Sequence, residues 1–163
     1  MCVAKKTVHH MDFGSLLRVN REVVLLTNEP HEFSEADSEK LNELLSEVKE
    51  RANNEKFEEA VTEKAAFLVF KVASGQHFRA GNKRTALVAG LVFLRKNGYK
   101  IDISSPGFVS VVDKVGIAAA DLDDVYDVMK ASVSKSVQER GSWETAIKKG
   151  VEANKKFLTD TGS

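Results

Sequence analysis

The apolar stretch at residues 86–94 constrains the fold of this chain more than any other feature, because it contains no polar residue. It is far shorter than the roughly 20 apolar residues that a membrane span requires. A helix that is apolar on all sides belongs in the interior of a protein. The Asn97-Gly98 pair that follows is typical of a left-handed helix exit. The sequence therefore predicts a helix over residues 81–96 at the centre of the core.

Apolar side chains recur at helical spacing in five further segments, which predict helices over residues 34–52, 57–74, 105–115, 122–133 and 143–157. The first begins with a capping-box-like pair, Ser34 and Asp37. Residues 19–26 are predicted to form a strand or a hairpin arm. The residues that alternate briefly after the central helix are predicted to lie in a loop: Tyr99, Ile101 and Ile103. The predicted fold is therefore all-α, or nearly so, around a buried central helix.

The composition fits one soluble domain. The chain has 163 residues, of which 42% are hydrophobic, enough for a packed core. Its 24 Lys and Arg balance 24 Asp and Glu, and a net charge of zero argues against a protein that coats nucleic acid or an anionic membrane. The single cysteine, Cys2, excludes an internal disulfide. We expect a cytoplasmic protein without a signal peptide, divided into an N-terminal arm at 1–33, a helical core at 34–135 and a C-terminal amphipathic helix at 136–163.

The charges are unevenly distributed along the chain. Residues 29–63 carry twelve carboxylates and four Lys or Arg, whereas residues 64–100 carry eight Lys or Arg and no Asp or Glu. One interpretation is that two solvated faces complement each other. The other interpretation is that the basic segment holds an anion.

The most informative segment is residues 76–85, Gln-His-Phe-Arg-Ala-Gly-Asn-Lys-Arg-Thr. A loop leads here into the start of the central helix, whose first turn carries Lys83 and Arg84. Cations at this end oppose the helix dipole, and a bound anion would reverse that effect. Free N–H groups, a glycine for close approach and two cations together predict a phosphate site. Alternatively, Lys83 and Arg84 contact carboxylates of residues 29–63.

The segment resembles the signature of the Fic/Doc family (filamentation induced by cAMP and death-on-curing proteins), His-x-Phe-x-Asp/Glu-Gly-Asn-x-Arg. The residues that match are Phe78, Gly81, Asn82 and Arg84. The resemblance is strong over residues 62–103, and Gly-Asn-Lys-Arg-Thr-Ala is similar to the death-on-curing branch. It implies a helical domain, often with a short β-hairpin that docks a target. It further implies ATP or another nucleotide as cofactor, transfer of AMP or phosphate to a protein hydroxyl, and a protein target or antitoxin-like helix as partner.

The same resemblance implies roles for the residues of the loop. Gly81 and Asn82 would line the phosphate loop, and Lys83 and Arg84 would neutralise phosphate oxygens. Leu87 stands where AMP-transferring members carry a second arginine. This substitution favours transfer of phosphate over transfer of AMP.

Two departures from the signature affect the chemistry. Gln76 stands at the position of the catalytic histidine, and a carboxamide cannot act as a general base, whose loss costs about 10²–10⁴ in rate. Ala80 stands at the position of the metal-binding acid, so the signature offers no side-chain ligand for Mg²⁺. Efficient catalysis of the family type is therefore not expected.

His77 is the histidine nearest to the position of the signature's catalytic histidine, but it follows that position by one residue. It could serve as the base if the loop were rotated by one residue. Phe78, as the apolar anchor under the loop, would instead point His77 away from the site. The remaining histidines are expected on the surface: His9, His10 and His31.

Three hypotheses follow. The first is a Fic/Doc-like protein that retains a phosphate or nucleotide site and has weak or altered transferase activity. The second is a catalytically dead module that binds a protein partner, and the third is a toxin-type enzyme inactivated by mutation. Gln76→His combined with Ala80→Asp or Ala80→Glu tests the third hypothesis, and no transfer activity after both changes would contradict it. The sequence leaves self-association open, and it predicts that Lys83→Ala or Arg84→Ala weakens phosphate binding while the fold stays largely intact.

Overall fold

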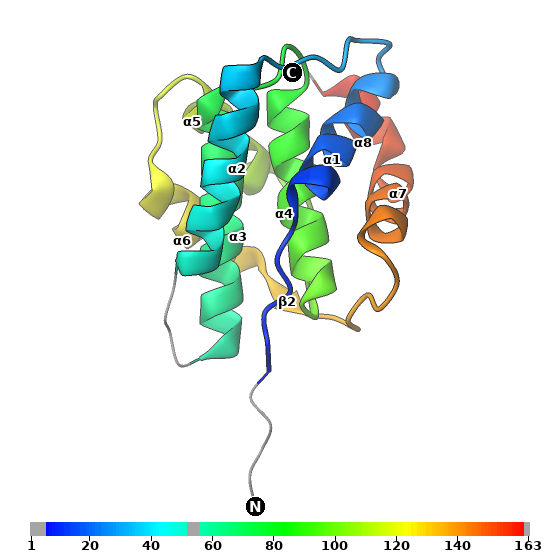
Figure 1. Cartoon of the computed structure of the whole chain (residues 1–163). Helices are drawn as coiled ribbons and strands as arrows, with labels where there is room; N and C mark the ends of the chain where they lie inside the picture. The colour runs from blue at the N-terminus through cyan, green and yellow to red at the C-terminus, as the bar shows by residue number, and fades with distance from the viewer. Residues whose placement is uncertain (1–5, 52–55, 162–163) are drawn as a thin grey trace, which may run out of the picture.

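The computed structural model describes residues 6–51 and 56–161, which are mainly α-helical as predicted (Figure 1). The helices in these ranges are α1 (Phe13–Leu25), α2 (Glu35–Glu50), α3 (Phe57–Gly75), α4 (Asn82–Lys96), α5 (Pro106–Gly116), α6 (Leu122–Ser132), α7 (Trp143–Ala153) and α8 (Lys155–Asp160). Two short strands complete the described part: β1 (Tyr99–Lys100) and β2 (Ser134–Lys135). None of the described helices is long and apolar enough to span a membrane.

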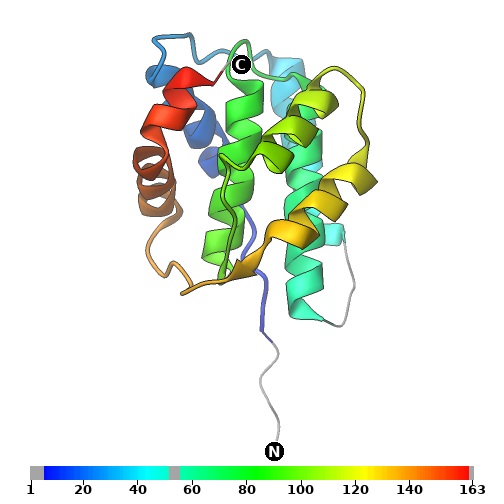
Figure 2. The same ribbon diagram turned by 180° about the vertical axis from the view of Figure 1, so that it is seen from behind.

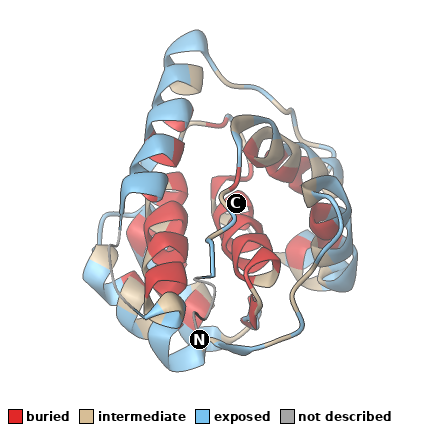
Figure 3. Ribbon diagram, turned by 60° about the horizontal axis from the view of Figure 1, so that its bottom comes forward, coloured by how far each residue is buried: buried red, intermediate tan, exposed pale blue. Residues whose placement is uncertain are grey.

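Helix α4 is the central helix of the core, which confirms the prediction from residues 86–94. It lies between α3 on one side and α1 and α7 on the other, and it also contacts α5 (Figures 1 and 2). Every residue of 86–94 is buried, and the buried residues of the surrounding helices face inward (Figure 3). Gly90 allows α3 to approach, because a Cβ there would lie 2.6 Å from Cγ2 of Val69.

The predicted strand or hairpin arm at residues 19–26 is wrong, because this segment belongs to helix α1. Asp12 caps the helix by accepting a hydrogen bond from the Ser15 N–H at 2.7 Å. The buried residues of α1 recur at helical spacing: Leu16, Val19, Asn20, Val23 and Val24. The β-branched valines favour a strand locally, but burial of this face against α4 and α7 outweighs that preference.

Two further predictions need correction. Tyr99 and Lys100 form strand β1 rather than a loop, because they pair antiparallel with Lys135 and Ser134 far along the chain. The predicted last helix at residues 143–157 is interrupted at Asn154, whose backbone leaves the helical region and separates α7 from α8. Ala52, predicted within α2, lies outside the described residues, as does Cys2.

Lys64 of α3 is buried and supports the end of α2. Its ammonium donates to the carbonyl oxygens of Val48 and Lys49 at 2.9 and 2.7 Å, and cations are favourable at a helix C-terminus. Burial lowers the pKa of Lys64. His10 is half-buried rather than on the surface. This burial, followed by the charges of Lys64 and Lys49, lowers its pKa from 6.5 to about 4. His10 is therefore neutral at pH 7.

Candidate functional site

The loop between α3 and α4 is held by two residues in the left-handed region. Gln76 ends α3 with φ 52° and ψ 42°, and Gly81 precedes α4 with φ 76° and ψ 20°. A Cβ on Gly81 would lie 2.9 Å from Cγ1 of Val24, so both the backbone conformation and the available space favour glycine here. No side chain caps α4.

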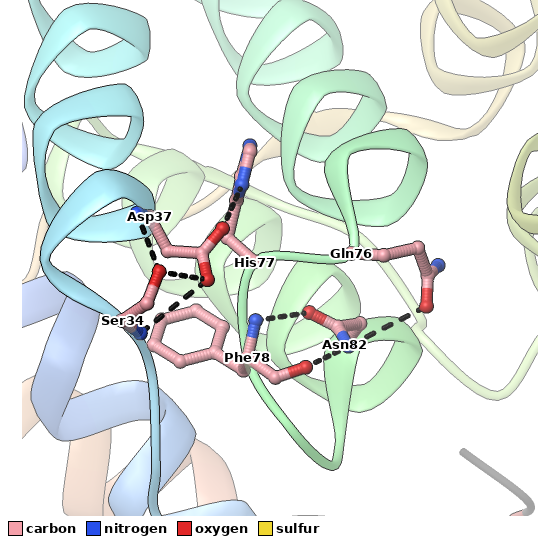
Figure 4. A network of polar contacts seen from close by, with 6 residues as sticks. All are labelled: Ser34, Asp37, Gln76, His77, Phe78 and Asn82. Carbon is pink, nitrogen blue, oxygen red and sulfur yellow. Dashed lines mark hydrogen bonds and ion pairs between the residues drawn. The ribbon is translucent and has the colours of Figure 1, made fainter.

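Asn82 closes the loop with its side chain. Its Oδ1 accepts from the Phe78 N–H at 3.0 Å, and its Nδ2 donates to the Phe78 carbonyl at 2.7 Å (Figure 4). The same Nδ2 lies 3.5 Å from Oε1 of Gln76. Phe78 is buried beneath the loop and packs its ring against Phe33, at a centroid distance of 5.9 Å, and against His31. The loop is therefore fixed by the hydrogen bonds of Asn82 and by the packing of the Phe78 ring.

His77 points toward α2, away from the space between the loop and α5. Its Nδ1 lies 3.0 Å from Oδ1 of Asp37, whose carboxylate also takes part in the capping box of α2 with Ser34 (Figure 4). Hydrogen bonds from Ser34 and then His77 lower the pKa of Asp37. The imidazole lies against Gly75, where a Cβ would be 2.3 Å from Nε2 of His77. His77 therefore ties the loop to α2.

Asn20 is a site residue that the sequence analysis missed. It is fully buried on α1, and its Nδ2 donates to the Ala80 carbonyl at 2.9 Å and to Oγ1 of Thr85 at 3.0 Å. Its Oδ1 lies 2.8 Å from Nδ1 of His31, which must carry the proton of that bond. His31 is half-buried rather than on the surface, and burial, followed by the charge of Arg21, lowers its pKa. The sequence signal that could have revealed Asn20 is its position as a polar residue on the apolar face of α1.

A cavity of about 330 Å³ opens where the loop and the start of α4 face α5. Its lining includes Gln76, Ala80, Lys83 and, from α5, Asp113. The Lys83 ammonium forms an ion pair with the Asp113 carboxylate. Asp113 lies outside residues 64–100, so counting carboxylates along that segment could not reveal it. Among the described residues that line the cavity, it is the only one with a carboxylate.

A sequence model of the Fic/DOC family matches residues 9–94, more than half of the chain. The chain belongs to the Fic/DOC family. No curated protein matches it. The matched region of this Fic/DOC protein begins before α1 and ends within α4, and so it includes the whole loop and the Asn20 network.

Arg84 of this Fic/DOC protein turns away from the cavity. Its side chain is 1% exposed, and Nη1 donates to the Val23 carbonyl and to Oγ1 of Thr27, each at 3.0 Å. Nη2 pairs with the carboxylate of Glu29. The hydrogen bond from Thr27 and, to a smaller extent, the contact with Arg84 lower the pKa of Glu29. Arg84 thus contacts a carboxylate of residues 29–63, whereas Lys83 contacts Asp113.

The residues present do not fit a dedicated Mg²⁺ site. Ala80 offers no side-chain oxygen, and Asp113 is paired with Lys83. Across residues 6–51 and 56–161, no group of three or more His, Cys, Asp or Glu is placed to share a metal ion. The first N–H groups of α4 have no intrahelical partner. Such N–H groups can donate hydrogen bonds to an anion rather than hold a cation.

Proposed function

We propose that the cavity binds the phosphate group of a nucleotide such as ATP, and that transfer chemistry of the family type is weak or altered. One observation supports this proposal most: α4 begins at the cavity with no side-chain cap, and Lys83 lies in the same lining. Helix N-termini bind anions through unpartnered N–H groups and the helix dipole. A cytoplasmic location, where ATP is available, would suit this role.

The phosphate would accept hydrogen bonds from the first N–H groups of α4 and from the Lys83 ammonium. The first intrahelical hydrogen bond of α4 joins the Thr85 N–H to the Gly81 carbonyl at 2.8 Å, which leaves the N–H groups of Asn82 and Lys83 for a ligand. Gly81 lets the ligand approach the backbone closely. Arg84 has no part in this proposal as a phosphate ligand, because its guanidinium is bound to α1 and Glu29.

Gln76 supports the weak-activity part of the proposal. Its Nε2 donates to the Ala73 carbonyl at 2.7 Å, so the carboxamide is held at the cavity wall. A carboxamide orients a substrate hydroxyl by hydrogen bonding but does not accept its proton at neutral pH. Transfer of phosphate to a protein hydroxyl would therefore proceed without a general base and about 10²–10⁴ more slowly than with one.

A catalytically inactive module that binds a protein target or an antitoxin-like helix is the second candidate. The segment after α5 favours it, since Ile117 lines the cavity and is 78% exposed. Ala118 and Ala119 beside it are exposed as well. A partner polypeptide that covers this apolar segment would remove it from water.

Lys83→Ala is expected to weaken binding of ADP by about tenfold or more, because a charge-assisted hydrogen bond contributes roughly 1.5–3 kcal/mol. Calorimetric titration of ADP into the wild type and the variant measures the loss. Lys114→Ala is the matched control, because it removes the same charge from the exposed side of α5 and lies outside the cavity lining. Equal affinities of wild type and Lys83→Ala would contradict the phosphate site.

A further inference from the structure

The ion pair between Lys83 and Asp113 places an anion of the protein itself inside the cavity. The Lys83 side chain is 17% exposed, whereas the Asp113 side chain is 53% exposed. The Lys83 side chain is thus largely enclosed, and the Asp113 side chain is open to solvent. Asp113 reaches Lys83 from α5, so the pair also joins the two walls of the cavity.

The other cation of the lining also has an acidic partner. Nη1 of Arg79 lies 2.7 Å from Oε2 of Glu32, and the Arg79 N–H donates to the Glu32 carbonyl at 2.9 Å. Both side chains of this second pair are more than half exposed, 68% for Arg79 and 56% for Glu32. Lys83 is therefore the enclosed cation of the described cavity lining, and its charge is already compensated by Asp113.

We infer that Asp113 determines the affinity and the charge specificity of the proposed phosphate site. In the free protein the Asp113 carboxylate is paired with the Lys83 ammonium. An entering phosphate replaces the carboxylate as the partner of that ammonium, and Asp113 turns to solvent. The Asp113 side chain is 53% exposed, so its carboxylate can be hydrated once it leaves Lys83. A ligand that brings more negative charge than one carboxylate is attracted more strongly to the ammonium, and the exchange then favours that ligand. The site then selects polyanions such as a nucleoside diphosphate over singly charged anions. This inference depends on the proposed function.

Asp113→Asn is expected to raise the affinity for ADP by about tenfold, or roughly 1.4 kcal/mol, because it frees Lys83 and removes a repelling charge. Calorimetric titration in EDTA measures this gain without a metal. Asp113→Glu keeps the charge and is expected to bind as the wild type does. Asp127→Asn removes a carboxylate from the exposed side of α6, outside the cavity lining, and is expected to leave the affinity unchanged.

The outcomes separate this inference from the proposed function. If the wild type binds ADP and Asp113→Asn binds equally or more weakly, the role of Asp113 is wrong and the phosphate site remains. Binding by Asp113→Asn alone would support both. If neither protein binds ADP, the phosphate site is wrong and the role of Asp113 falls with it. An equal gain in Asp127→Asn would show a general charge effect and would also overturn the inference.

Discussion

Arg84→Ala is expected to lower the free energy of unfolding by about 2–4 kcal/mol, since it removes a buried side chain whose hydrogen bonds join α4 to α1 and to Thr27. The Arg84 side chain is 1% exposed, and its guanidinium binds Val23, Thr27 and Glu29. Its loss leaves the Val23 carbonyl without that donor and opens a cavity between α1 and α4. For a chain of this size, the melting temperature should fall by roughly 10 °C.

Thermal and urea unfolding, followed by circular dichroism, measure this loss. Arg140→Ala is the control, because Arg140 is exposed and surface substitutions usually change stability by no more than about 0.5 kcal/mol. Arg84→Lys keeps the charge but loses the planar fork, and it should lie between wild type and Arg84→Ala. The sequence alone predicts a largely intact fold for Arg84→Ala, and the buried placement of the Arg84 side chain adds the expectation of a lower stability. Stability equal to that of the control would contradict the structural role.

Asn20→Ala is expected to lower the free energy of unfolding by about 2–4 kcal/mol, because it leaves buried polar groups without partners. The Ala80 carbonyl and the Thr85 hydroxyl lose their donor, and His31 loses its acceptor. Since Ala80 belongs to the loop at the cavity, the variant should also bind ADP more weakly.

Asn42→Ala is the matched control for Asn20→Ala. Asn42 is exposed on α2, and its side chain donates to the Ser38 carbonyl at 3.1 Å within the same helix. Urea unfolding should show little change for this variant, and calorimetry should show the same ADP affinity as in the wild type. Asn20→Ala with the stability of Asn42→Ala would show that the network does not hold the loop.

The sequence predicted the helices well because their signals are local. Residues 86–94 have to be buried wherever they lie, and a capping box such as that at Ser34 marks a helix start without reference to the rest of the chain. The strand pair of β1 and β2 was missed because its partners are far apart in sequence. Helix α1 was misread because valines favour strands locally, while tertiary packing favours the helix.

The candidate site was only partly predictable for the same reason. The loop residues are contiguous, so Gln76, Ala80 and Lys83 could be placed together from the sequence. Asp113 and Asn20 come from other helices, and their contacts depend on how α5 and α1 pack against α4. The direction of the Arg84 side chain likewise depends on the Val23 carbonyl at the end of α1.

The measurement that tests the central claim most directly is a calorimetric titration of ATP into the wild-type protein, with EDTA and then with Mg²⁺. The claim is that the anion site is present and that the cavity lacks a dedicated metal site. It predicts binding in EDTA with an affinity that changes little when Mg²⁺ is added. Binding that requires Mg²⁺ would show that the cavity does hold the metal, and no binding in either condition would contradict the phosphate site itself.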